Sequence, residues 1–267
     1  MEIHTSQPRR LEVIQPTKVK TPDFAADLRA RAIDVAVVMA YGRILPRGVL
    51  EAPRLGCVNL HASILPRYRG AAPITWSVVN GETVTGVSLM QMDEGMDTGP
   101  VFTWREVPIG PDVTAGEVSE LLAACAADVV RLDLPRVVSG ELHAVPQDHA
   151  AATMAPMLSK DDGRIDWSRP AARVHDHTRG MSPWPGAWTT LGGKLLKVLE
   201  TRIAMGEAGG APGEVVIAHK GRCEVACGEG RVEIVRAQVE GKKALGANDL
   251  VSGRTLALGM RLGHDPA

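Results

Sequence analysis

The sequence has 267 residues, of which 45% are hydrophobic and 23% charged, and its formal net charge is −1. At ~150 residues per domain this length suggests two domains, and the apolar content excludes intrinsic disorder. Apolar runs fall short of the ~20 residues of a membrane helix, the N-terminus lacks an apolar signal region, and four scattered cysteines do not form a disulfide scaffold. We therefore expect a cytoplasmic protein that does not enter a membrane.

Strands and helices alternate over the first half of the chain. We expect strands at residues 11–15, 34–40, 57–61, 86–92 and 101–108, and helices at 22–32, 46–51, 72–79 and 115–138. Thr21 is the expected N-cap of the first helix, and Thr114 with Glu117 forms a capping box before the last, which Gly140 closes. The apolar run at 34–40 is typical of a strand covered on both faces. This order predicts an α/β fold with an open parallel sheet.

The pattern changes after Gly140. Residues 143–158 contain two prolines and little periodicity, as expected of a linker. Ser168 is a candidate cap for a short helix at 170–179. From residue 187 onward, short β segments separated by glycine pairs predict a small barrel. We place the domain boundary near residue 158.

Charge is distributed unevenly between the two halves. Residues 1–158 contain 14 basic and 18 acidic side chains, whereas residues 159–267 contain 16 and 13. Two explanations stay open at this point: chance variation between ordinary domains, or a C-terminal part that meets a polyanion.

Two predicted strand ends carry the polar residues that could do chemistry. Asn59 and His61 are two apart, so on a strand both side chains point to the same side. The glycine-flanked loop after the next strand can bring Asp97 back to His61, and no Ser, Thr or Cys nucleophile accompanies them. Asn59 and His61 could instead be a buried, hydrogen-bonded pair with a structural role, and the loop that contains Asp97 could be an acidic turn. A metal would need a third ligand, and because His143 and His149 lie in the linker we expect none.

Four sequence segments resemble one enzyme family. The segment NLHASILPRYRGAAPI resembles the N-x-H-x-S-x-L-P signature of folate-dependent formyltransferases, and DEGMDTGP resembles their second motif. The segments LSKDDGRIDWSRPA and SPWPGAW are similar to the branch that acts on methionyl-tRNA. The resemblance covers residues 11–260.

The resemblance implies transfer of a formyl group from 10-formyltetrahydrofolate, a co-substrate, to the α-amine of methionine on initiator tRNA. It implies a Rossmann-like catalytic domain at residues 1–142, a linker at 143–158 and an OB-like, tRNA-binding domain at 159–267, in a monomer without metal. Carried onto this sequence, the catalytic residues are Asn59, His61 and Asp97, and the folate-binding residues are Ser63, Ile64, Leu65 and Pro66.

Members of this family usually begin with a further strand, a glycine-containing turn, a helix and a second strand. The resemblance implies that the catalytic domain is incomplete at its N-terminus. Three explanations stay open: a start codon assigned too far downstream, which we favour; a genuine truncation with impaired activity; or a non-catalytic tRNA-binding remnant. A related transformylase that acts on an amino sugar nucleotide or another small amine is the alternative enzyme.

The second half also contains residues that could contact RNA. Candidate phosphate contacts are Lys194, Lys197, Arg222, Lys242 and Lys243. Trp184 and Trp188 can either stack on bases or pack in the barrel core. Cys223 and Cys227 lack a second cysteine pair, so we expect core or surface residues and no zinc site.

Overall fold

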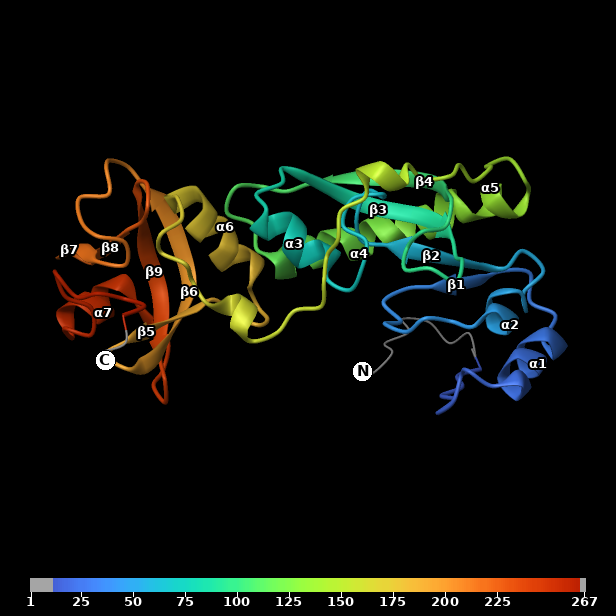
Figure 1. Ribbon diagram of the computed structural model, residues 1–267, viewed down its shortest axis with the longest axis horizontal. Coiled ribbons are helices and arrows are strands. Elements are labelled where there is room, and N and C mark those ends of the chain that lie inside the picture. The colour runs from blue at the N-terminus through green and yellow to red at the C-terminus, as the bar shows by residue number, and fades with distance from the viewer. Residues whose placement is uncertain (1–11, 265–267) are drawn as a thin grey trace.

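The computed structural model describes residues 12–264, which form two bodies joined end to end (Figure 1). The first contains α1 (Pro22–Ala30), β1 (Ala36–Val38), α2 (Arg47–Leu50), β2 (Cys57–His61), α3 (Pro73–Val79), β3 (Val84–Gln91), β4 (Val101–Pro108), α4 (Ala115–Leu132) and α5 (Leu134–Val138). The second contains α6 (Ala171–Gly180), β5 (Trp188–Leu191), β6 (Lys194–Ala204), β7 (Val215–His219), β8 (Arg222–Ala226), β9 (Arg231–Val239), β10 (Leu245–Gly246) and α7 (Ala247–Ser252). Within residues 12–264, no helix is long and apolar enough to cross a membrane.

The first body is built on a mixed sheet with the strand order β1-β2-β3-β4. β1 and β2 are parallel, but β3 runs antiparallel to both β2 and β4. The expectation of a parallel sheet is therefore correct for the first pair only. β2 and β3 are antiparallel although residues 62–83, which include α3, join them. For β3 and β4 the reason is the nine-residue loop 92–100, since a parallel crossover needs about a dozen residues or more. A loop this short can return the chain only in the opposite direction.

One face of this sheet is covered by α4, which packs on buried residues of β2 and β3 such as Val58 and Leu89 (Figure 1). Because side chains alternate along a strand, the apolar Val58 and Leu60 point to this face and leave Asn59 and His61 on the other. Burial of the apolar set thus determines which face of β2 carries the polar pair.

The edge strand β1 differs from expectation. It is shorter than residues 34–40, and Val37 and Met39 are 42% and 51% exposed, so the strand is not covered on both faces. Ala36 and Val38 pack against a small buried cluster that includes Ala25, Leu45 and Leu50. Residues 12–15 are irregular instead of a strand, and residue 11 lies outside the described residues.

Capping signals placed the starts of α1 and α4 correctly. The Thr21 hydroxyl accepts from Phe24 N at 3.3 Å, and Thr114 forms the expected reciprocal box with Glu117. The long helix is interrupted, however, because α4 ends at Leu132 and α5 begins after Asp133. Pro135 follows this break and has no N–H to continue the α4 ladder.

The second body is an antiparallel sheet with the strand order β5-β6-β9-β8-β7, on which β10 pairs with β9. Its core is formed by alternating residues such as Leu196, Val198 and Ile234, together with α6 and α7. A small β domain is therefore confirmed, but no pairing of β5 with β7 closes it into a barrel within the described chain. Ser168 does not cap α6: its hydroxyl bonds to Asp166, and Pro170 occupies the N-cap.

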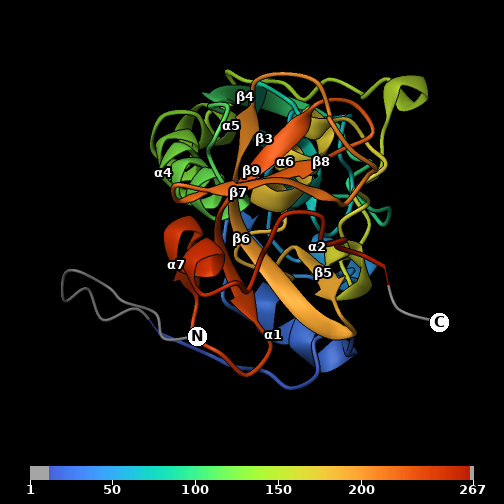
Figure 2. The same cartoon turned by 90° about the vertical axis from the view of Figure 1, so that its left-hand side faces the viewer.

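The two bodies meet where α6 packs on α3 (Figure 1). Gly180 makes this approach possible, because a Cβ there would lie 2.9 Å from the backbone nitrogen of Val79. The buried Arg179 also donates to the carbonyl of Val113, which precedes α4 (2.9 Å). In Figure 1, α7 lies on the side of the second body away from this joint, and Figure 2 looks at the second body from that side.

Candidate active site

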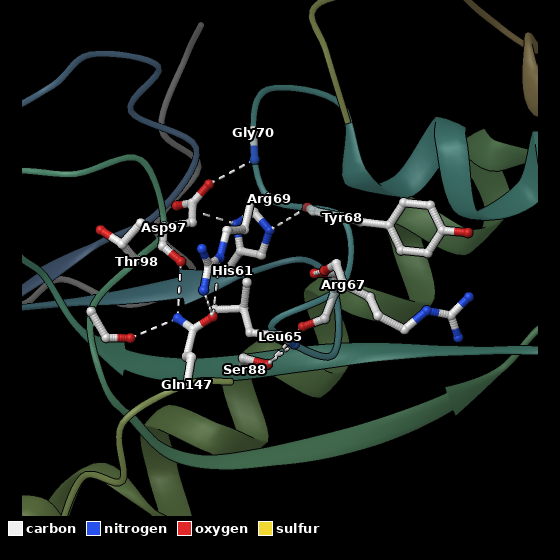
Figure 3. Close-up of polar contacts among 12 residues, drawn as sticks. His61, Leu65, Arg67, Tyr68, Arg69, Gly70, Ser88, Asp97, Thr98 and Gln147 are labelled. Carbon is white, nitrogen blue, oxygen red and sulfur yellow. Dashed lines mark hydrogen bonds and ion pairs between the residues drawn. The ribbon is translucent and has the colours of Figure 1, made fainter. Parts of the chain in front are cut away.

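The imidazole of His61 lies at the end of β2, is 5% exposed, and meets a hydrogen-bond acceptor at each ring nitrogen (Figure 3). Its Nε2 lies 2.8 Å from the carbonyl oxygen of Tyr68, which can only accept, so Nε2 carries a hydrogen. Its Nδ1 lies 3.6 Å from Oδ1 of Asp97. The ring therefore donates to the Tyr68 carbonyl and presents its other nitrogen to the Asp97 carboxylate.

Asp97 reaches His61 from the loop between β3 and β4, as the sequence predicts. Its φ of +54° places it in the left-handed region, which Asp tolerates better than most residues. The second carboxylate oxygen accepts from the backbone N–H of Gly70 at 2.8 Å. Nearer the start of the loop, Asp93 accepts from Gly95 N and from the Thr98 hydroxyl. These bonds hold the carboxylate beside the imidazole.

Segment 147–155 is not a free linker. Thr153 and Ala155 exchange backbone hydrogen bonds with Arg69, and the carbonyl of Ala155 accepts from Ala72 N. The contact requires Gly70: its φ is +118°, and a Cβ would lie 2.7 Å from the carbonyl oxygen of Ala155. The segment therefore packs along the loop that follows His61.

Two residues near Asp97 were not among the predicted site residues. Arg69 is 6% exposed, and its guanidinium donates to Oε1 of Gln147 and contacts His149 (Figure 3). Gln147 in turn donates to the carbonyls of Asp97 and Gly99. Only the Arg-Tyr-Arg-Gly run pointed to Arg69, and no spacing signal pointed to Gln147, which comes from 50 residues beyond Asp97.

The four predicted folate-binding residues form the turn directly after His61. Ser63 is completely buried: its hydroxyl donates to the carbonyl of Arg67 at 2.6 Å, and its own carbonyl accepts from Ser88. Leu65 is buried against Met90, so only Ile64 and Pro66 are partly exposed. A shallow hollow elsewhere, which extends from α2 to the start of the Asp97 loop, is lined by none of these four. Its lining includes Arg47, Leu50, Gly56, Gln91, Met92 and Glu94.

The predicted RNA contacts divide into two groups. Lys194, Lys242 and Lys243 are exposed at one end of the second sheet, because the turn at Gly241 lies beside the start of β6. Lys197 is exposed on the same strand. Arg222 lies apart from them and pairs with the buried carboxylate of Glu224.

The surroundings of the tryptophans and cysteines in the second body show which of these side chains lie in the core. Trp184 is 54% exposed and does not pack in the core, while Trp188 lies under the guanidinium of Arg164. Cys223 and Cys227 are buried core residues with free thiols. Within residues 12–264, no group of three or more His, Cys, Asp or Glu side chains is arranged to hold a metal ion.

Known proteins similar to this chain are formyltransferases. Residues 3–130 match the formyl transferase family, and residues 157–255 match the formyl transferase C-terminal domain. A methionyl-tRNA formyltransferase of Sorangium cellulosum is 63% identical over 94% of this chain and 82% of its own, and one of Myxococcus xanthus is 50% identical over 94% and 80%.

Two solved structures share the fold at low sequence identity. HypX of Aquifex aeolicus in complex with tetrahydrofolic acid has a TM-score of 0.64 at 20% identity, covering 88% of this chain and 41% of that one. WlaRD, a sugar 3N-formyl transferase, has a TM-score of 0.63 at 16% identity, covering 83% and 81%.

Proposed function

The chain belongs to the methionyl-tRNA formyltransferase family, and on that basis we propose that it transfers the formyl group of 10-formyltetrahydrofolate to the α-amine of methionine on initiator tRNA. The observation that carries this proposal is the identity of 63% over 94% of the chain to a protein of that name. The geometry around His61 supports it, because the buried imidazole lies between the Tyr68 carbonyl and the Asp97 carboxylate, on the face of β2 that also carries Asn59.

The reaction joins the amine nitrogen to the formyl carbon, breaks the bond from that carbon to N10 of the folate, and moves one amine proton to N10. Negative charge develops on the formyl oxygen as the amine attacks. We propose that Asn59 donates its amide N–H to this oxygen, since the side chain is partly exposed and makes no hydrogen bond within residues 12–264. We propose that His61, held between the Tyr68 carbonyl and Asp97, is the second polar group beside this oxygen.

Asp97 has a second proposed role. Its carboxylate is partly accessible, with 16% of the side-chain surface exposed, and only one of its oxygens is bonded to Gly70. We propose that Asp97 accepts the amine proton, directly or through a water, as the tetrahedral species forms. Ser63, Ile64, Leu65 and Pro66 then act as the turn that positions the donor, with contact through the exposed parts of Ile64 and Pro66.

The proposed division of labour follows the two bodies. Residues 1–142 would perform the formyl transfer, and residues 143–158 would link them to the second domain. Residues 159–267 would bind tRNA through Lys194, Lys197, Lys242 and Lys243. We also propose that the chain works as a 28.4 kDa monomer, in the cytoplasm where charged tRNA enters translation. Light scattering on the purified chain tests the monomer.

A single-turnover assay tests the function. Enzyme in excess is mixed with 10-formyltetrahydrofolate and either methionyl initiator tRNA or a nucleotide-linked amino sugar. We expect formyl-methionyl-tRNA and no formylated sugar. Product from the sugar alone would favour the small-amine transformylase, and tRNA binding without product from either would favour a non-catalytic binder.

A further inference from the structure

Gln147 makes four hydrogen bonds with both ends of its side-chain amide, although it comes from the segment between the two sheets (Figure 3). Its Oε1 accepts from Nε and Nη2 of Arg69, at 3.1 and 2.6 Å. Its Nε2 donates to the carbonyls of Asp97 at 2.9 Å and Gly99 at 2.6 Å. The side chain is 9% exposed, so water offers little replacement for these bonds.

The direction of this amide is determined by its neighbours. A guanidinium has only donors, so Oε1 must face Arg69, and the two carbonyls have only lone pairs, so they must meet the NH₂ group. Glutamate at this position would satisfy Arg69 but not the carbonyls, and an apolar side chain would satisfy neither. Glutamine meets both requirements at once.

The bonds of Gln147 act on the backbone of the residue that faces His61. Asp97 has a positive φ, and the Gln147 bonds hold the carbonyls of Asp97 and Gly99 on either side of Thr98. The Asp97 carboxylate is held separately, by Gly70 N. Backbone and side chain of Asp97 are therefore attached to two different segments, and the orientation of its carboxylate depends on both.

We propose that Gln147 is a positioning residue for Asp97: its amide, oriented by Arg69, keeps the Asp97 carboxylate beside His61. The inference rests on the catalytic role proposed above for Asp97. A displacement of reacting groups by about 1 Å can reduce a rate by ~100-fold, so loss of these bonds affects the chemical step more than substrate binding.

The decisive variant is Gln147→Glu, which keeps the acceptor for Arg69 but places a carboxylate oxygen against two carbonyls. We expect kcat for formyl transfer to fall roughly tenfold to a hundredfold, with KM for the folate changed less than about threefold. Gln147→Met, which removes both sets of bonds, gives a second measurement if Gln147→Glu folds poorly. Asp148→Ala is the matched control, because it alters the same segment at an exposed side chain that caps Ala150 and does not touch Asp97.

A double-variant comparison separates positioning from a general structural effect. In an Asp97→Asn background, Gln147→Glu should cause little further loss of kcat, because its effect passes through Asp97. Equal fold losses in both backgrounds, or wild-type kcat in Gln147→Glu, would overturn the inference.

Hydrogen exchange distinguishes failure of this inference from failure of the proposed function. We expect the peptide that covers residues 93–99 to exchange faster in Gln147→Glu than in wild type or Asp148→Ala. If wild type formylates no tRNA, the proposed function fails, and the amide exchange of the 93–99 peptide alone tests the inference. Faster exchange in Gln147→Glu than in wild type supports positioning by Gln147, and unchanged exchange overturns it.

Discussion

His61 is the residue on which the proposed chemistry depends, because it combines burial with acceptors at both ring nitrogens. Its position follows from the strand: Asn59 and His61 point away from α4, so the two side chains share one face of β2. An amide donor and an imidazole on one face are suited to a developing oxyanion.

Replacement of these two side chains should affect the chemical step. We expect Asn59→Ala to reduce kcat by ~100-fold or more, the usual cost of removing one oxyanion donor, while KM for the folate changes little. We expect His61→Ala to reduce kcat as well, because the imidazole lies between the Tyr68 carbonyl and Asp97 and holds this side of the site in place. Steady-state kinetics over a range of folate concentrations provide both constants, and thermal unfolding shows whether the variants remain folded. An unchanged kcat with a raised KM would contradict the proposed roles.

The buried thiols predict a pH dependence of stability. Burial raises the pKa of Cys57 and Cys227 to about 11 and that of Cys223 to about 12, from 9.0 in the unfolded chain. Above pH 9 the unfolded chain loses thiol protons that the folded chain retains, so the free energy of unfolding falls as the pH rises toward 11.

This effect can be measured with Cys223→Ala. Denaturant unfolding at several values between about pH 8 and pH 10.5 should show a shallower decline for the variant than for wild type. The slopes of unfolding free energy against pH for the two proteins differ by at most about 1.4 kcal/mol per pH unit, which is the limit for one titrating group. Parallel curves for the two proteins would show that the Cys223 thiol does not titrate as its burial requires.

At the scale of elements, the contact between segment 147–155 and the loop after β2 decides the shape of the site. Arg69 pairs with this segment on its backbone and with Gln147 through its side chain. The glycine that follows, Gly70, has no space for a side chain. Residues 78 positions apart in sequence thus form one wall beside His61.

Gly70→Ala should disrupt this packing. We expect a loss of ~2–4 kcal/mol in the free energy of unfolding, from backbone strain together with the overlap on Ala155, and a lower kcat. Gly140→Ala is the matched control, since Gly140 also has a positive φ but no atom within 4 Å of a built Cβ. Both variants carry the cost of backbone strain, but only Gly70→Ala also overlaps Ala155. The difference between their free energies of unfolding, measured with denaturant, therefore gives the cost of the overlap. Equal losses would show that the packing against Ala155 has little energetic effect.

At the scale of the whole molecule, charge separates the proposed roles of the two bodies. Residues 159–267 carry a net excess of basic groups, and three lysines lie at one end of the second sheet. Arg222 is held by Glu224, so we expect it to contribute less to binding of phosphates than these lysines.

Salt dependence of tRNA binding tests this surface. The triple variant Lys194→Gln, Lys242→Gln and Lys243→Gln should bind tRNA more weakly and reduce the slope of log K against log salt by roughly 0.7–0.9 for each phosphate that the protein no longer neutralises. The double variant Lys18→Gln and Lys20→Gln, at exposed positions before α1, controls for net charge. Equal slopes for wild type and the triple variant would remove these lysines from the interface.

Local signals in the sequence determined much of the fold. β2 and β4 lie at the residues expected from their apolar patterns, and the caps at Thr21 and Thr114 form as predicted. These features depend on contacts within one strand or one helical turn, so the adjacent residues contain the necessary information. The motifs around His61 and Asp97 were recognised for the same reason.

Tertiary structure alone decided the direction of β3 relative to β2, the exposure of β1 and the role of Gln147. Each depends on partners distant in the chain: Val37 is exposed because nothing in the described chain covers that face, and Gln147 matters because folding brings it to Asp97. A glutamine in an irregular segment has no periodicity that distinguishes it from a solvent-exposed residue. Its hydrogen bonds exist only after 50 residues of intervening chain have folded between the two positions.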